Sequence, residues 1–267
     1  MTREKETLVT QSLKGQRAVI TAGAAGIGLA IANCFAKAGA QIVVCDVDER
    51  ALESCRAAHP DWTVLRCDVS VRADADAFMH SVHQRFGGQL DVLVNNAGIA
   101  GPTAGIENID PDDWDRCLAV NLTGMFLIIR RAVPMLRAAG GGAIINLSSA
   151  AGKLGFPKRA PYSATKFGII GVTETLAMEL GPDQIRVNAI LPGVVAGDRQ
   201  ERVLAAKAQA NGISIDEQRK RAVASVSMRT MVEAEDIAQA ALYLASPAGR
   251  YVSGERISVG GNVENLS

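Results

Sequence analysis

The chain has 267 residues, of which 48% are hydrophobic and 21% charged, enough apolar material to bury a large core. Lys+Arg and Asp+Glu both number 28, so the formal net charge is zero and no overall field attracts nucleic acid or an anionic membrane. The composition argues against disorder and favours a small-molecule partner.

The N-terminal residues and the cysteines indicate where the protein is located and which kinds of metal site or disulfide its sequence lacks. Residues 1–13 are mostly polar and lack the apolar core of a signal peptide, so we expect a flexible extension on a cytoplasmic protein. The five cysteines are scattered, without the spacing of a zinc site or a disulfide framework. We therefore expect no metal site.

From Lys14 onward, short β-branched segments alternate with longer segments of helical period, the pattern of parallel strands joined by crossover helices. The predicted strands are Arg17–Thr21, Gln41–Asp46, Thr63–Cys67, Leu90–Asn95, Ala143–Leu147, Ile185–Ile190 and Arg256–Val259. The predicted helices are Ile27–Lys37, Val71–Phe86, Pro111–Ala139, Ala160–Leu180 and Ala234–Ala245. This order predicts an α/β fold: one doubly wound, seven-stranded, mainly parallel sheet in a single domain over residues 14–267.

Residues 197–230 break this rhythm. They form a charged, amphipathic stretch between the sixth predicted strand and the last predicted helix. We expect this insertion to cover the substrate site as a lid.

A small-residue loop, Thr21–Gly28, follows the first predicted strand and opens a helix. Glycine lets the backbone approach a pyrophosphate closely, and the helix N-terminus stabilises its charge. A plain strand-to-helix turn is the alternative interpretation. The expected cofactor contacts in the loop are Gly23, Ala25, Gly26, Ile27 and Gly28.

Two aspartates end neighbouring strands at the edge where such sheets bind ligands. Asp46 is placed to accept hydrogen bonds from the adenosine ribose, and its charge would repel a 2′-phosphate. Neither Val47 nor Ala25 supplies a compensating cation, which favours NAD over NADP. Asp68 suits the adenine amino group, although either aspartate would equally serve as a turn or helix cap.

Tyr162 and Lys166 lie one helical turn apart, on one face of a predicted helix. A unit charge about 5 Å away at an effective dielectric near 20 supplies roughly 3 kcal/mol, enough to lower a phenol pKa by about two units. Ser149, at the end of the fifth predicted strand, would orient a substrate oxygen there. Each feature alone also has an ordinary structural explanation.

Taken in order, these motifs resemble the short-chain dehydrogenase/reductases from about Lys14 to Asn262. The matching segments are Thr21–Gly28, Asp68-Val69, Asn95-Asn96-Ala97-Gly98, Asn121, Ser149, Tyr162-xxx-Lys166, Pro192-Gly193 and Val252-Ser253-Gly254-Glu255. Two positions depart from the family pattern: Ala22 stands at the first loop glycine, and Gly197 where a threonine often holds the carboxamide.

The resemblance implies a catalytic tetrad and further cofactor contacts. Tyr162 would exchange the proton, Ser149 position the substrate oxygen, Lys166 bind the ribose and lower the tyrosine pKa, and Asn121 interrupt the long helix and relay protons. The additional cofactor contacts implied are Asp68, Val69, Asn95, Ala97, Gly98, Pro192 and Val195. The family pattern also implies a homotetramer.

The expected reaction is NAD-dependent interconversion of a secondary alcohol and a ketone, with a polyol, sugar or hydroxy acid as substrate. A 3-oxoacyl reductase acting on a carrier-protein or CoA thioester is the alternative, and a non-catalytic dinucleotide-binding protein ranks below both. The basic residues Lys153, Lys158, Arg159, Arg199 and Arg202 are candidates for binding a carboxylate or phosphate, unless they are simply solvated.

Overall fold

The structure, a computed structural model, describes residues 11–266, apart from the side chain of Arg199. Seven strands form one sheet in the order β3-β2-β1-β4-β5-β6-β7, and every neighbouring pair is parallel. The predicted doubly wound fold is therefore confirmed. The strands are β1 Arg17–Thr21, β2 Gln41–Asp46, β3 Thr63–Arg66, β4 Val92–Asn95, β5 Gly142–Leu147, β6 Ile185–Pro192 and β7 Arg256–Val259.

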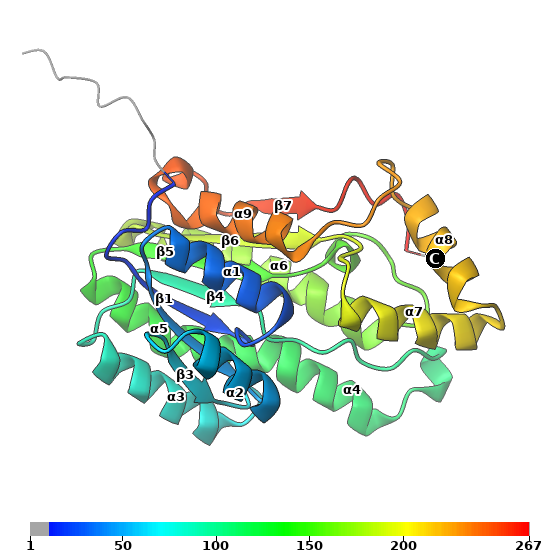
Figure 1. The fold of residues 1–267 in the computed structure, drawn as a ribbon, viewed down its shortest axis with the longest axis horizontal. Helices are drawn as coiled ribbons and strands as arrows, with labels where there is room; N and C mark the ends of the chain where they lie inside the picture. Colours follow the sequence, from blue (N-terminus) through cyan, green and yellow to red (C-terminus); the bar gives the residue numbers. More distant parts are fainter. Residues whose placement is uncertain (1–10, 267) are drawn as a thin grey trace, which may run out of the picture.

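Helices cover both faces of the sheet, and Figure 1 shows α1 and α9 side by side on one of them. This face carries α1 Gly26–Lys37, α2 Glu49–Ala58 and α9 Ala234–Ala245, and the other carries α3 Arg72–Arg85, α5 Gly124–Ala138 and α6 Ala160–Leu180. Successive strand residues point to opposite faces, so Val19 packs in one core while Ala18 and Ile20 pack in the other.

Two features of the N-terminal half differ from the predictions. Helix α2 was not predicted, because it is short and mostly polar and only Leu52 and Cys55 on it are buried. The flexible extension assigned to residues 1–13 is wrong at its inner end. Leu13 is fully buried and its backbone N–H donates to Ala38 O at 2.9 Å, whereas residues 1–10 lie outside the described part of the chain.

The long predicted helix from Pro111 is not one regular helix. It consists of α4 Pro111–Leu118, a π-helical turn Ala119–Thr123 and α5. By length and composition this run could cross a membrane, but nearly half of its apolar window is buried inside the protein and α5 contributes to the core, as expected of a core helix. The interruption falls at Asn121, as the family resemblance implied.

The second and third strands along the chain are added on one side of β1, and the later strands, beginning with β4, are added on its other side. Strands β1 and β4 are therefore hydrogen-bonded neighbours. Strands β2 and β3 extend the sheet on one side of this point and β5 to β7 on the other. Crossover connections on either side then leave a crevice at the carboxyl ends of the strands, where open α/β sheets bind ligands.

Gly28 tests the backbone path at this point. A Cβ at Gly28 would overlap Ala22 O and lie 2.5 Å from Asn96 Nδ2, so Gly28→Ala should lower the free energy of unfolding by more than about 3 kcal/mol. Gly171→Ala is the matched control, because nothing lies within 4 Å of its Cβ position in α6, and it should gain about 0.5–1 kcal/mol. Thermal or urea unfolding measures both, and equal stability of the two variants would contradict this geometry.

Candidate active site

A cleft of about 580 Å³ opens at the carboxyl edge of the sheet. Residues at the ends of β2, β5 and β6 and at the start of α1 line its floor. The predicted lid segment forms two helices, α7 Asp198–Asn211 and α8 Ile215–Ala224, and both contribute residues to the lining. In Figure 1 these helices, drawn in yellow and orange, lie beyond the end of the sheet.

The loop between β1 and α1 is tied to the end of β4. Thr21 Oγ1 accepts from Asn96 N and Ala97 N at 3.0 Å each, and Asn96 Nδ2 donates to Thr21 O and Ala22 O at 3.1 and 3.0 Å. Ala22 takes a left-handed conformation with φ 49°, which glycine would adopt without strain. Alanine at position 22, where the family pattern has glycine, therefore adopts the left-handed backbone conformation that glycine would also allow.

The N-terminus of α1 is suited to a pyrophosphate. Its N-cap residue, Ala25, makes no side-chain cap hydrogen bond, so the first N–H groups of the helix face the cleft without an internal acceptor from that residue. At Gly26, φ is 52° and nothing lies within 4 Å of the Cβ position. Ala25, Gly26 and Ile27 all line the cleft, and the residues present fit a dinucleotide.

Asp46 lines the cleft and also serves the local turn. Its Oδ1 accepts from Val47 N at 2.8 Å and from Asp48 N at 3.3 Å, while Oδ2 lies 3.4 Å from Ala24 N. Asp46 can therefore serve both predicted roles. The backbone N–H groups of the turn hold its carboxylate, and the residue also lines the cleft where a ribose would bind.

The second strand-end aspartate is engaged locally. Asp68 Oδ1 accepts from Ser70 N at 2.9 Å and from Ser70 Oγ at 2.6 Å, and Val69 is buried against Gly124. The cap interpretation of Asp68 is therefore satisfied, and contact of Asp68 and Val69 with adenine stays a prediction.

The side chains predicted to react line the same cleft. Ser149 follows β5, Tyr162 and Lys166 lie on α6, and all three are lining residues. Lys166 is 3% exposed, its Nζ donates to Leu147 O at 2.8 Å, and the ammonium lies 5.6 Å from the Tyr162 ring centroid. Ser149 Oγ accepts from Ala151 N at 3.2 Å, which turns the hydroxyl toward the start of the next helical turn. A phenol and an ammonium are thereby held together at the carboxyl edge of the sheet.

Asn121 connects the π-helical turn to this group. Its Oδ1 accepts from Ile99 N at 2.7 Å, and its Nδ2 donates to Thr165 Oγ1 and Ile99 O at 3.1 Å each. A Cβ at Gly98 would lie 3.2 Å from Asn121 Oδ1 and 3.6 Å from Lys166 Nζ. The absence of a side chain at Gly98 thus lets the asparagine and the lysine lie close to one another.

The remaining predicted cofactor residues occupy two strand ends. Asn95 Nδ2 donates to Asn146 Oδ1 at 2.8 Å, which pins the end of β4 to β5. Pro192 and Val195 line the cleft after β6. Val195 also forms an isolated β-bridge with Val232, so the strand-end segment is held from both sides.

The five basic candidates separate into groups. Lys153 Nζ donates to Ser258 Oγ, and Lys158 Nζ donates to Ala210 O and Asn211 Oδ1 at the end of α7, so both have local structural roles. Arg159 and Arg202 line the cleft, whereas the Arg199 side chain is outside the described part. The structure adds Lys207, which the sequence analysis missed.

Lys207 is held in an unfavourable environment for a cation. Burial first, and then the positive charges of Arg159 and Lys158, lower its pKa from 10.5 to about 8. Its ammonium lies 4.8 Å from the Phe156 ring centroid. At neutral pH the protonated lysine therefore persists at a cost to the stability of the fold.

Removal of this charge should stabilise the protein. The unfolded chain binds more protons between pH 8 and 10.5, so Lys207 makes the free energy of unfolding rise with pH across that window. Because the side chain is only half-buried, Lys207→Met should gain about 1 kcal/mol at pH 7, and this gain should vanish near pH 10.5. Urea unfolding across pH measures it, with exposed Lys220→Met as the matched control; a pH-independent difference between the variants would contradict the assignment.

Among the described residues, no group of three or more His, Cys, Asp or Glu side chains could hold a metal ion. The chemistry that the site can perform with its own residues is proton transfer and stabilisation of a bound dinucleotide and an oxygen-bearing substrate.

Solved structures share this architecture. The chain is similar to an NAD+-bound xylitol dehydrogenase, with a TM-score of 0.88 and 29% identity over 93% of this chain and 99% of that one. It is also similar to a levodione reductase, with a TM-score of 0.86 and 30% identity over 93% and 97% of the two chains.

Sequence comparison gives the same result. A family model described as Enoyl-(Acyl carrier protein) reductase matches residues 22–262. The D-beta-hydroxybutyrate dehydrogenase of Rhizobium meliloti is 38% identical over 91% of this chain and 96% of its own, and the galactitol 2-dehydrogenase of Agrobacterium fabrum is 37% identical over 94% and 98%. Together with the cleft geometry, these matches show that the chain belongs to the short-chain dehydrogenase/reductase family and is an NAD(P)-dependent oxidoreductase of CH–OH groups.

Proposed function

We propose that the protein oxidises a secondary alcohol to a ketone with NAD, and that Tyr162 takes the hydroxyl proton. The observation that carries this proposal is the position of the buried Lys166 ammonium, 5.6 Å from the Tyr162 ring, in the same cleft as the start of α1. The hydroxysteroid, hydroxybutyrate and galactitol dehydrogenases among its relatives support the reaction class.

The proton moves from the substrate hydroxyl to the phenolate oxygen of Tyr162 while Ser149 Oγ donates a hydrogen bond to the same substrate oxygen. The nearby Lys166 charge favours the phenolate over the phenol, which is what general-base work at neutral pH requires. NAD+ held at the start of α1 and beside Asp46 would accept the carbinol hydrogen together with its bonding electron pair, as a hydride, so that the C–O bond becomes C=O. Reduction runs through the same groups, with Tyr162 returning the proton.

Asn121 serves in this proposal as the residue that links Lys166 to the loop after β4. Its amide bridges Ile99 and Thr165, so it holds the π-helical turn against α6. The Cβ position of Gly98 lies 3.2 Å from Asn121 Oδ1 and 3.6 Å from Lys166 Nζ, so the amide and the ammonium lie near one another, which supports a role of Asn121 in renewing the proton on Tyr162.

NAD is favoured over NADP because Asp46 faces the cleft where β2 ends. The next residue, Val47, is exposed and apolar, and the loop residue Ala25 carries no charge. A 2′-phosphate would therefore meet a carboxylate without a neighbouring cation from these positions. The NAD+-bound xylitol dehydrogenase among the similar structures agrees with this choice.

A 3-oxoacyl reductase is the second candidate, because the matching family model is described as a reductase of acyl groups bound to a carrier protein. Purified protein incubated with NAD and separate panels of polyols, hydroxy acids and hydroxyacyl thioesters tests both functions through absorbance of the reduced nicotinamide. Turnover of thioesters alone would replace the first proposal by the second.

We also propose a homotetramer. The exposed aromatic side chains Phe126 on α5 and Phe167 on α6 support it, because burial of such residues between subunits is favourable. The cytoplasmic location stays a prediction.

Replacement of the phenol should stop the chemistry and spare binding. Tyr162→Phe should lower kcat by about 10³-fold or more, since it removes the proton acceptor, while the Kd for NAD changes less than about threefold. Steady-state kinetics measure kcat, and displacement of fluorescent NADH by NAD measures the Kd for NAD. Tyr251→Phe, which removes the same hydroxyl from a side chain that is 90% exposed, is the control. Undiminished turnover in Tyr162→Phe would remove the mechanism.

The charge on Asp46 should set the cofactor preference. Asp46→Asn keeps the shape but removes the repulsion, so the ratio of kcat/KM for NAD to that for NADP should fall by about tenfold or more. The exposed Asp61→Asn, in the loop before β3, is the matched control. An unchanged ratio in Asp46→Asn, or NADP preference in the unaltered protein, would contradict the assignment.

A further inference from the structure

Besides Lys166, three cationic side chains among the described residues line the cleft that contains Tyr162. Arg159 precedes α6, and Arg202 and Lys207 project from α7; all three line the cleft. The mechanism proposed above uses none of them.

Arg159 is the best defined of the three. It is 2% exposed, its Nη2 donates to Ala100 O at 2.5 Å, and its guanidinium carbon lies 5.1 Å from the Phe156 ring centroid and 5.2 Å from that of Tyr162. One edge of the guanidinium is thus held by a backbone carbonyl, and the group also lies against two aromatic rings. An arginine fixed in this way is preorganised for a planar oxyanion.

Lys207 approaches the same aromatic ring from α7. Its ammonium is 4.8 Å from the Phe156 centroid, and Phe156 packs edge-on against Tyr162 with 6.5 Å between the ring centroids. Two cations from different elements therefore meet around one ring, next to the phenol.

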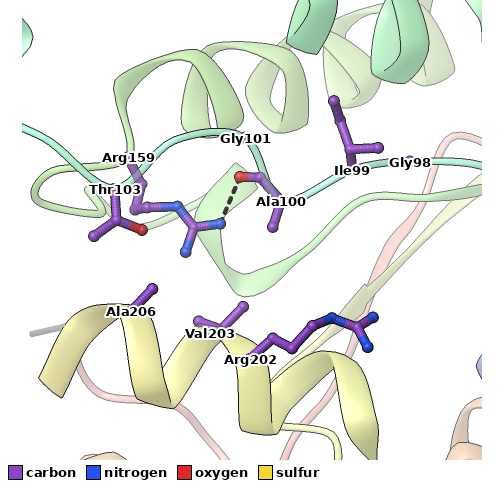
Figure 2. A pocket seen from close by; sticks show the side chains of 9 residues that line it. All are labelled: Gly98, Ile99, Ala100, Gly101, Thr103, Arg159, Arg202, Val203 and Ala206. Atoms are coloured by element: carbon purple, nitrogen blue, oxygen red, sulfur yellow. Dashed lines mark hydrogen bonds between the residues drawn. The ribbon is translucent and has the colours of Figure 1, made fainter. Parts of the chain in front are cut away.

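A second, smaller pocket of about 330 Å³ adjoins this place and shares Arg159 and Arg202 with the main cleft. Figure 2 shows Arg159 pointing from its loop toward α7, where Val203 and Ala206 lie beneath it, whereas Arg202 extends from α7 with its guanidinium directed away from Arg159. The described residues lining this smaller pocket include both arginines and no acid. The acids that line the main cleft are Asp46 and Asp48 at the end of β2, and Asp198 one turn before Arg202 on α7.

We propose that the substrate carries an anionic oxygen group, a carboxylate or a phosphate, which binds between Arg159 and Lys207 while its carbinol carbon faces Tyr162. This proposal rests on the alcohol oxidation proposed above and names its substrate class. Burial first, and then the positive charges of Arg159 and Lys158, lower the pKa of Lys207, and an anion bound beside its ammonium would offset the repulsion between these cations. Hydrogen bonds to a charged acceptor are stronger than those to a neutral one, so the site should select against uncharged analogues.

The test compares pairs of substrates with and without the anionic charge; the members of each carboxylate pair also have nearly the same shape. The carboxylate series is lactate, 3-hydroxybutanoate and 4-hydroxypentanoate, each against its primary amide; the phosphate series is glycerol 3-phosphate against glycerol; galactitol and xylitol form a neutral panel. For the best pair, kcat/KM at pH 7 should be at least about tenfold higher for the anion. The series that shows this preference identifies the anionic group.

Two variants locate the preference. Arg159→Met should lower the ratio of kcat/KM for anion over neutral analogue by about tenfold or more, and Lys207→Met should lower it by a smaller factor. Lys220→Met removes a charge from an exposed position of α8 and is the matched control. If Arg159→Met fails to fold, Lys207→Met carries the test, because its side chain is only half-buried.

A binding measurement without turnover separates this inference from the proposed function. Calorimetric titration of the NAD-saturated protein with butanoate and with butanamide should show binding of the acid, weakened in Lys207→Met. Oxidation of neutral alcohols with no preference for anions would overturn the inference and leave the proposed function standing. Failure of every alcohol, charged or neutral, to reduce NAD would overturn the proposed function. Equal affinities for butanoate and butanamide, together with no preference for glycerol 3-phosphate over glycerol, would overturn the anion site itself.

Discussion

A buried ammonium group joins the reacting helix to the central sheet. Lys166 Nζ donates to Leu147 O at the end of β5, and Ser148 Oγ donates to Lys166 O, so two hydrogen bonds of 2.8 Å fasten α6 to the strand that precedes Ser149. Taking a charge out of water is expensive unless hydrogen bonds compensate it. Because the same lysine lies beside the ring of Tyr162, the contact that anchors the helix also fixes the electrostatics of the phenol.

The nucleotide end of the cleft is organised by backbone contacts, independently of that charge. The Thr21 hydroxyl and the Asn96 amide bind the ends of β1 and β4 to each other at the point where sheet growth reverses. The loop before α1 is therefore held in shape by the protein itself, and a dinucleotide would bind to N–H groups that are already oriented. Preorganisation of this kind reduces the ordering cost of binding. The reacting end and the nucleotide end meet along the carboxyl edge, which is why one sheet can position both.

Much of the architecture was predictable from the sequence because the strands are short apolar runs that alternate with longer segments of helical period; β1, β2 and β7 begin and end where expected. The convergence of Ser149, Tyr162 and Lys166 followed from strand ends and helical spacing. Helix α2 was not predicted because only two of its side chains are buried. Lys158 and Arg159 are adjacent, and no sequence pattern shows that one caps α7 while the other enters the cleft. Lys207 was missed since its position depends on how α7 packs against the rest of the protein.

The π-helical turn at Ala119–Thr123 has a consequence for the evolution of chain length. An α-helix advances about 100° per residue, so the wider turn offsets the direction in which α4 and α5 present their buried sides. Cys117 before the turn and Met125 after it are both buried. Loss of one residue here would leave a regular helix with better hydrogen-bond geometry, yet it would rotate one buried side into solvent and withdraw Asn121 from Ile99. Indels should therefore be purged from this segment even though it lies within a helix, while surface loops elsewhere vary freely in length.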